Sequence, residues 1–215
     1  VRQIEEYYAQ CELEGANEHQ VEESQKAVAK MEVIIGDPDR LRAVAEDFIK
    51  HYETRVAEGA TVAGKAMFVC SNRNIAYDFY KIVKELRPEW TEKKICDDGV
   101  VLSEKDKKEL KPMEKIKLVM TRNKDDEKDL FDMLGTKEDR KEFDRQFKNP
   151  KSNFKIAIVV DMWLTGFDVP ELDTIYIDKP IQQHTLIQTI SRVNRVCEGK
   201  DKGLSLIHIS EPTRH

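Results

Sequence analysis

Hydrophobic and polar positions divide the chain into a helical front and a body of alternating short strands and amphipathic helices. In the front, Asp37-Pro38 is typical of a helix start, because aspartate can cap free amides and proline needs no N–H donor there. The apolar residues that follow keep helical spacing. Residues 1–58 are therefore predicted to form a helical lead-in.

Short runs that are apolar throughout begin near Lys65. The predicted strands are 66–70, 116–121, 156–160 and 174–178. Continuous rather than alternating apolarity is typical of strands that are covered on both faces. The first strand is followed by apolar positions at helical spacing. This order predicts an α/β fold with a mostly parallel sheet flanked by helices.

Two heavily charged intervals, 104–117 and 124–151, are expected to connect elements over the surface of the sheet. The second interval contains a predicted helix, which begins near Thr136 and buries Phe143 and Phe147. Both intervals are thus assigned mainly to connections.

Composition indicates one soluble globular unit. The chain has 215 residues, 40% of them hydrophobic, which is enough for one substantial core and an accessory segment. No apolar run approaches the roughly 20 residues that span a bilayer, and the N-terminus lacks the order of a signal peptide. A cytoplasmic location without a membrane partner is expected. The formal net charge of −5, with an acidic front and a nearly neutral body, leaves any DNA contact to local patches.

The four cysteines are widely and irregularly spaced, and none has a histidine at ligand spacing beside it. Buried free thiols are expected, and no metal site. Residues 59–66 nearly spell a phosphate-binding P-loop, but Ala66 lacks the magnesium-binding hydroxyl. The glycines also follow a predicted helix and precede a strand, the reverse of the P-loop order. We interpret them as a helix stop and a turn, so no ATP cradle is expected.

The loop that follows the strand 156–160 lies where ligands of open α/β sheets bind. Gly166 permits close backbone approach, and Asp168 could accept ribose hydroxyls, although an ordinary turn would also use these residues. Trp163 and Phe167 are expected in the core rather than as stacking platforms.

A second candidate follows the first strand, where Ser71-Asn72-Arg73 opens a helix. Free amides, a hydroxyl and a guanidinium could hold a phosphate there, and simple N-capping explains Ser71 and Asn72 equally well.

A third candidate is the segment 188–195. On a helix, Gln188, Arg192 and Arg195 lie within about 60° of one another, and the apolar positions lie on roughly the opposite side. A guanidinium suits phosphate because it is planar, permanently charged and able to donate two parallel hydrogen bonds. A solvated polar face is the alternative.

Together, Ser71-Asn72-Arg73, the segment Thr165 to Pro170 and the segment Gln188 to Arg195 resemble the fourth, fifth and sixth motifs of superfamily 2 helicases. More narrowly, residues 147–195 resemble the motor subunit of type I restriction endonucleases, and the likeness extends over roughly residues 37–204. The resemblance implies a RecA-like fold, with residues 59–204 as the second of two RecA-like lobes.

The same resemblance implies an ATP-driven double-stranded DNA translocase that is part of a site-specific deoxyribonuclease. Arg192 and Arg195 would face the triphosphate, at least one of them as an arginine finger. Gln188, Gly166 and Asp168 would be nucleotide-binding residues. ATP and Mg²⁺ would be held mainly by the first lobe, which this chain lacks. The implied DNA-backbone contacts are Ser71, Arg73 and Thr165. Further implied partners are that first lobe and the specificity and methylation subunits.

This fragment is not expected to hydrolyse ATP or cut DNA alone, since the P-loop, the acidic magnesium motif and the nuclease residues are absent from it. It is expected to be truncated at both ends. Residues 205–215 resemble the translation of a sequencing adapter and are left out of the fold. Two alternatives remain: a non-catalytic nucleic-acid or protein interaction module on a RecA-like fold, and an unrelated small-molecule enzyme on a flavodoxin-like sheet.

Overall fold

The computed structural model describes residues 31–164, 168–179, 191 and 204–207. Five of the candidate site residues lie outside these ranges: Thr165, Gly166, Gln188, Arg192 and Arg195. The front of the predicted lead-in, residues 1–30, also lies outside them.

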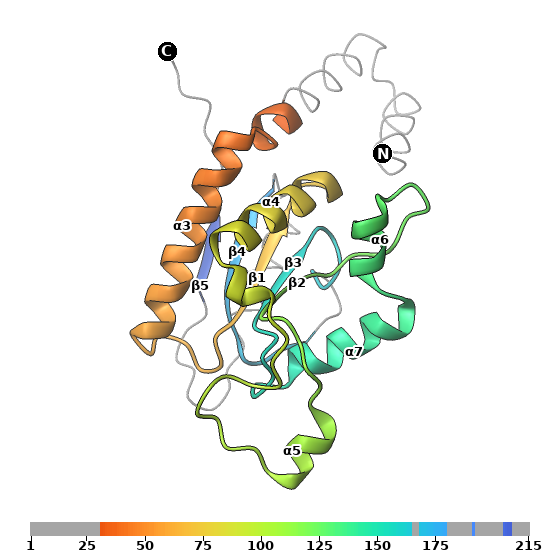
Figure 1. The fold of residues 1–215 in the computed structure, drawn as a ribbon. Helices are drawn as coiled ribbons and strands as arrows, with labels where there is room; N and C mark the ends of the chain where they lie inside the picture. Colours follow the sequence, from red (N-terminus) through yellow and green to blue (C-terminus); the bar gives the residue numbers. More distant parts are fainter. Residues whose placement is uncertain (1–30, 165–167, 180–190, 192–203, 208–215) are drawn as a thin grey trace.

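A parallel sheet forms the centre of the described structure (Figure 1). Its strands lie side by side in the order β2-β3-β1-β4-β5, and every pair of neighbours is parallel. The strands are β1 Lys65–Cys70, β2 Ile116–Leu118, β3 Ile156–Val159, β4 Leu172–Asp178 and β5 Leu204–Ile207. Every residue of β1 to β4 is buried, as continuous apolarity predicts for strands covered on both faces. The α/β fold class is confirmed.

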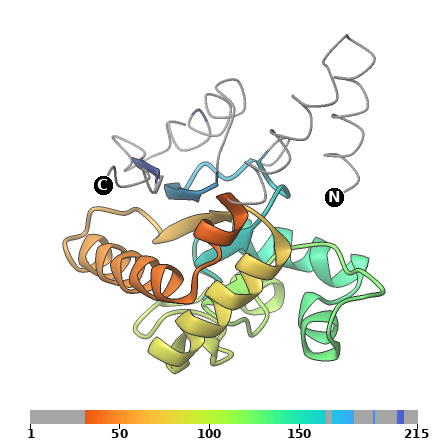
Figure 2. The ribbon, with the colours of Figure 1, turned by 90° about the horizontal axis from the view of Figure 1, so that it is seen from above.

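Helices α3 and α4 cover one face of this sheet (Figure 2). The described helices are α3 Pro38–Ala57, α4 Arg73–Leu86, the 3-10 helix η1 Pro88–Thr91, α5 Glu104–Glu109, α6 Lys128–Leu134 and α7 Lys137–Lys148. The predicted start of α3 is confirmed, because the Asp37 side chain accepts a hydrogen bond from the Arg40 amide at 2.9 Å. No described helix is long and apolar enough to cross a bilayer.

Aromatic side chains join α3 to the sheet. Phe48 of α3 packs edge-on against Tyr176 of β4, with ring centroids 4.8 Å apart, and against Phe68 of β1 at 5.2 Å. Phe68 in turn stacks on Phe79 of α4 at 3.9 Å. All four rings are almost fully buried, and burial of one such ring stabilises a fold by roughly 2 kcal/mol. The helix placed in the lead-in by its sequence thus shares the core of the sheet.

The opposite face is covered in part by α7 and by the loop after β3. The fully buried Phe147 of α7 stacks on Trp163 at 5.3 Å, and Trp163 itself is 9% exposed. The expectation that Trp163 belongs to the core is confirmed. Phe147 is buried as expected, whereas Phe143 is only partly buried.

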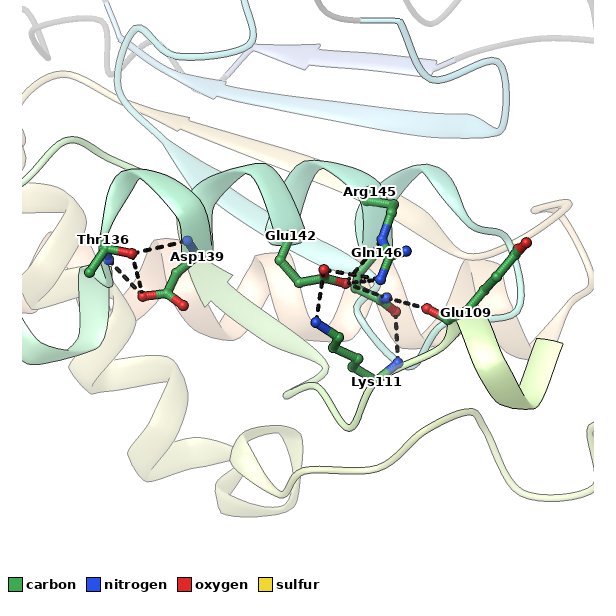
Figure 3. Close-up of polar contacts among 7 residues, drawn as sticks. All are labelled: Glu109, Lys111, Thr136, Asp139, Glu142, Arg145 and Gln146. Atoms are coloured by element: carbon green, nitrogen blue, oxygen red, sulfur yellow. Dashed lines mark hydrogen bonds and ion pairs between the residues drawn. The ribbon is translucent and has the colours of Figure 1, made fainter. Parts of the chain in front are cut away.

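Helix α7 is held by polar contacts at both of its ends (Figure 3). At its start, Thr136 and Asp139 form a reciprocal capping box. Near its end, the 1% exposed Gln146 donates to the Glu109 carbonyl at 2.9 Å and accepts from the Lys111 amide at 3.2 Å. Glu142 accepts from Gln146 at 2.7 Å and from the Lys111 ammonium at 3.0 Å. These bonds dock α7 on the end of α5 and on the segment that follows it.

Two stretches show how sequence and structure compare. Residues 59–64 form the expected turn, with positive φ at Gly59 and Gly64, and Lys65 then opens β1. Residues 205–207 differ from the expectation, because they form β5 with Leu204 and pair with β4 although they were left out of the fold. The sequence 204–207 is mostly apolar, so it can pair with the edge strand β4, even though it resembles translated adapter sequence.

Candidate functional site

The carboxyl ends of β1, β2, β3 and β4 meet at one edge of the sheet, because all of these strands are parallel. Ligands of open α/β sheets bind at this edge. Of the sequence candidates, Ser71 and Arg73 lie in the connection after β1, and Asp168 lies in the connection between β3 and β4.

Ser71 and Asn72 have separate tasks. Asn72 caps α4, since its side chain accepts a hydrogen bond from the Ile75 amide at 3.0 Å. The Ser71 hydroxyl instead donates to the Asp178 carbonyl at 3.0 Å. The N-capping interpretation is therefore confirmed for Asn72, whereas Ser71 links the end of β1 to the end of β4.

Arg73 is held by groups of the connection after β2. Its Nη1 donates to the Thr121 carbonyl, and its Nη2 to both carboxylate oxygens of Asp126, all at 2.6 Å. The Asp126 side chain is 7% exposed and also accepts from the Asn123 amide at 2.7 Å. The pair is partly buried, with 26% exposure at Arg73, and its charge-assisted hydrogen bonds restrict both side chains. In this arrangement Arg73 fixes the loop 121–126.

A hollow of about 180 Å³ lies between the ends of β2 and β3. It is lined by the polar residues Arg73, Thr121, Asn123 and Asp161 and by the apolar residues Val119, Met120, Val160 and Met162. Pockets that enclose a drug-sized ligand usually measure about 300–1,000 Å³. A nucleotide would therefore need a second surface in addition to this hollow.

Lys179 and Asp161 bridge the ends of β4 and β3. The Lys179 ammonium donates to Asp161 Oδ1 at 2.5 Å and to the Val160 carbonyl at 3.4 Å. Since β1 lies between β3 and β4, this ion pair crosses the end of β1. In the sequence, Lys179 directly follows the predicted strand 174–178, and nothing there indicates Asp161 as its partner.

Asp178 is the most buried charged group of this edge, with 1% exposure. Its carboxylate accepts hydrogen bonds from both terminal nitrogens of the Arg40 guanidinium, from Nη1 at 3.0 Å and from Nη2 at a shorter distance. Burial raises the pKa of the Cys70 thiol well above its ordinary value, and the nearby Asp178 carboxylate raises it further. Sequence reasoning missed Arg40 altogether.

The loop after β3 contains a strained residue. Trp163 has a φ of +68°, the one positive value at a non-glycine residue within the described ranges. A large side chain rarely adopts this conformation, and its cost is of order 1–3 kcal/mol. The stacking of Trp163 on Phe147 supports it. Asp168 follows in the same connection and is exposed.

Comparison with known proteins gives concordant matches. Residues 62–208 match the family model of domain 3 of the type I restriction enzyme subunit R. The chain is 36% identical over 181 residues to the HindI endonuclease subunit of a type I restriction enzyme from Haemophilus influenzae, an alignment that covers 84% of this chain and 15% of that subunit. It is 49% identical over 59 residues to the SauCOLORF180P endonuclease subunit of a type I enzyme from Staphylococcus aureus, which covers 25% of this chain and 6% of that subunit.

One solved structure bears on the fold. A fragment described as an HsdR subunit of a type I restriction enzyme from Vibrio vulnificus superposes with a TM-score of 0.50 at 13% identity, over 79% of this chain and 28% of that one. The likeness agrees with the RecA-like fold class. The chain spans less than a third of the length of each of these relatives.

Proposed function

Because the chain belongs to the family of domain 3 of type I restriction enzyme R subunits, we propose that it is the second RecA-like lobe of an ATP-dependent double-stranded DNA translocase. The observation that carries this proposal is the carboxyl edge of the sheet. The connections after β1, β2 and β3 meet there around a hollow of about 180 Å³, which is small for a nucleotide. Such an edge suits a site that a second lobe completes.

The nucleotide-facing residues are proposed from the sequence. Arg192 and Arg195 would approach the triphosphate, at least one as an arginine finger, and Gln188 would couple nucleotide state to its helix. A finger accelerates hydrolysis by about 10³–10⁵, because it neutralises charge that grows in the transition state. Gly166 and the exposed Asp168 would line the nucleotide edge. ATP and Mg²⁺ would be held mainly by the first lobe.

The DNA-facing residues are proposed at the same edge. Ser71 and Thr165 would contact the phosphate backbone, which gives grip without reading sequence. Arg73 is held by Asp126, so its proposed contribution to DNA binding runs through the loop 121–126. Both the deoxyribonuclease residues and the first lobe would lie elsewhere in the same polypeptide. Specificity and methylation subunits would be the protein partners of a cytoplasmic complex, and the isolated fragment would turn over no ATP.

The test is DNA-stimulated ATP turnover by the complete R subunit with Arg192→Ala or Arg195→Ala. We expect a loss of about 10³-fold or more in at least one variant, with an unchanged melting temperature. Arg145→Ala is the matched control, since Arg145 is an exposed arginine of α7 paired with Glu142. Full turnover in both variants would contradict the finger assignment. DNA binding without any turnover in the unsubstituted subunit would favour a non-catalytic interaction module.

A further inference from the structure

Arg40 connects three elements at the start of α3. Its Nη1 donates to the Asp178 carboxylate and to the Ile35 carbonyl, each at 3.0 Å, and its Nη2 binds the other Asp178 oxygen. Its own amide is bound by Asp37, the N-cap of α3. The guanidinium therefore holds the turn before α3, α3 itself and the carboxyl end of β4 in one arrangement.

The partner of Arg40 is a junction of the carboxyl edge. The Asp178 carbonyl accepts the Ser71 hydroxyl, which joins the connection after β1. The next residue, Lys179, is 21% exposed and binds the connection after β3 through the Val160 carbonyl and through Asp161, whose side chain is 72% exposed. A displacement of Asp178 would thus move two of the loops that the proposed function places against DNA.

A second arginine of the same helix shows what an ordinary surface ion pair looks like here. Arg42 binds Glu85 at 3.1 Å, but these side chains are 47% and 63% exposed, against 14% for Arg40 and 1% for Asp178. Exposed pairs contribute little to structure, whereas a buried, doubly hydrogen-bonded carboxylate allows few alternative positions. Both arginines lie on α3, but the partner of Arg40 is buried and the partner of Arg42 is exposed.

We propose that Arg40 is a positioning residue, through which α3 fixes Asp178 and Lys179 and thereby the Ser71 hydroxyl and the Asp161 loop for DNA. The inference rests on the proposed function. It assigns a role to a helix that lies outside the matched residues 62–208. Arg40 touches no substrate in this scheme and acts only through Asp178.

The experiment measures ATP turnover by the complete R subunit as a function of DNA concentration, below the melting temperature of each variant. Arg40→Met and Asp178→Asn should each raise the DNA concentration for half-maximal turnover by about tenfold, and the double variant should add little because both changes break one contact. The rate at saturating DNA should stay within about twofold of the unsubstituted subunit, because DNA restores the arrangement. Arg42→Met should change neither value.

A half-maximal concentration in Arg40→Met equal to that of Arg42→Met would overturn the inference, and so would a lower melting temperature as the only effect. If Arg40→Met does not fold, Arg40→Lys is measured instead, since lysine keeps the charge but cannot make two parallel bonds. An unchanged half-maximal concentration in that variant would also overturn it. Absence of DNA-stimulated turnover in the unsubstituted subunit would instead remove the proposed function, and this inference with it.

Discussion

One guanidinium nitrogen of Arg73, Nη2, lies 2.6 Å from both carboxylate oxygens of Asp126. The two residues join the start of α4 to the connection after β2, and the side chain of Asp126 is the more buried of the two. A guanidinium at this place was expected from the sequence to bind a phosphate. In the structure its Nη2 binds the Asp126 carboxylate instead, and Arg73 also lines the hollow.

The change Asp126→Asn separates a framework role from a direct DNA contact. If Arg73 acts through the loop 121–126, Asp126→Asn and Arg73→Ala should raise the DNA concentration for half-maximal ATP turnover to a similar extent, roughly threefold to tenfold, with little further effect in the double variant. Turnover by the complete R subunit at fixed salt measures this, because phosphate contacts depend strongly on salt. A lower half-maximal concentration in Asp126→Asn would instead reveal competition between the carboxylate and DNA.

Lys81→Ala is the matched control for this series. Lys81 lies on α4, as Arg73 does, and pairs with Asp78 at 2.7 Å on an exposed surface. The change should leave the DNA dependence within about twofold, since exposed ion pairs contribute little.

Strands β1 to β4 could be predicted from the sequence because they are short, apolar and bounded by polar residues, whereas β5 was not predicted. Predicted and observed bounds agree within one residue for β1 and β3. The agreement is poorer for β2, which ends at Leu118 although the sequence predicted a strand up to Thr121. Beyond the strand, the Thr121 carbonyl accepts a hydrogen bond from the distant Arg73 side chain. Local patterns carry no signal of that contact.

The polar links of the carboxyl edge could not be predicted for the same reason. Arg40 and Asp178 are 138 positions apart, and Arg73 and Asp126 are 53 apart. Charged residues make up 36% of the chain, so each arginine has many possible partners in the sequence. Which partner is buried with it depends on how the strands are ordered in the sheet, and only the three-dimensional structure gives that order.

Gln146 offers a test of how α7 is docked. Gln146→Ala should lower the free energy of unfolding of this chain by about 2 kcal/mol, because it removes the hydrogen bonds that the buried Gln146 side chain makes with the Glu109 carbonyl and the Lys111 amide. Urea denaturation monitored by circular dichroism measures the effect. Arg145→Ala on the same helix removes an ion pair with Glu142, in which Arg145 is 54% exposed, and should cost no more than about 0.5 kcal/mol. Equal losses in both variants would contradict the docking role.

Thr165→Ala tests the DNA-facing assignment of the loop after β3. If the hydroxyl contacts the DNA backbone, the variant should need about three to ten times more DNA for half-maximal ATP turnover by the complete R subunit, while its KM for ATP stays within about twofold. Thr136→Ser is a suitable control, because Thr136 caps α7 with a hydroxyl that serine retains. A raised KM for ATP with an unchanged DNA dependence would move Thr165 to the nucleotide side.

Lys65 is 1% exposed, and its ammonium has a backbone carbonyl, that of Phe154, as its hydrogen-bond acceptor at 2.5 Å. Burial, and then the neighbouring charge of Lys155, lowers the pKa of Lys65 well below 10.5. Lys65→Met should therefore raise the free energy of unfolding by about 1–2 kcal/mol at pH 7, because it removes a poorly compensated buried amine. Lys117→Met is the control and should give no such gain, since the buried Lys117 pairs with Glu114 at 3.0 Å.

The advantage of Lys65→Met should depend on pH in a defined direction. Between the lowered pKa of the folded state and 10.5, the unfolded chain binds a proton at Lys65 that the folded chain does not. Stability of the unsubstituted chain should therefore rise with pH in this window relative to Lys65→Met, by at most about 1.4 kcal/mol per pH unit. Urea denaturation of both chains at several pH values up to about 10 measures the difference. A difference that stays constant or widens as the pH rises would show that burial does not penalise the ammonium of Lys65.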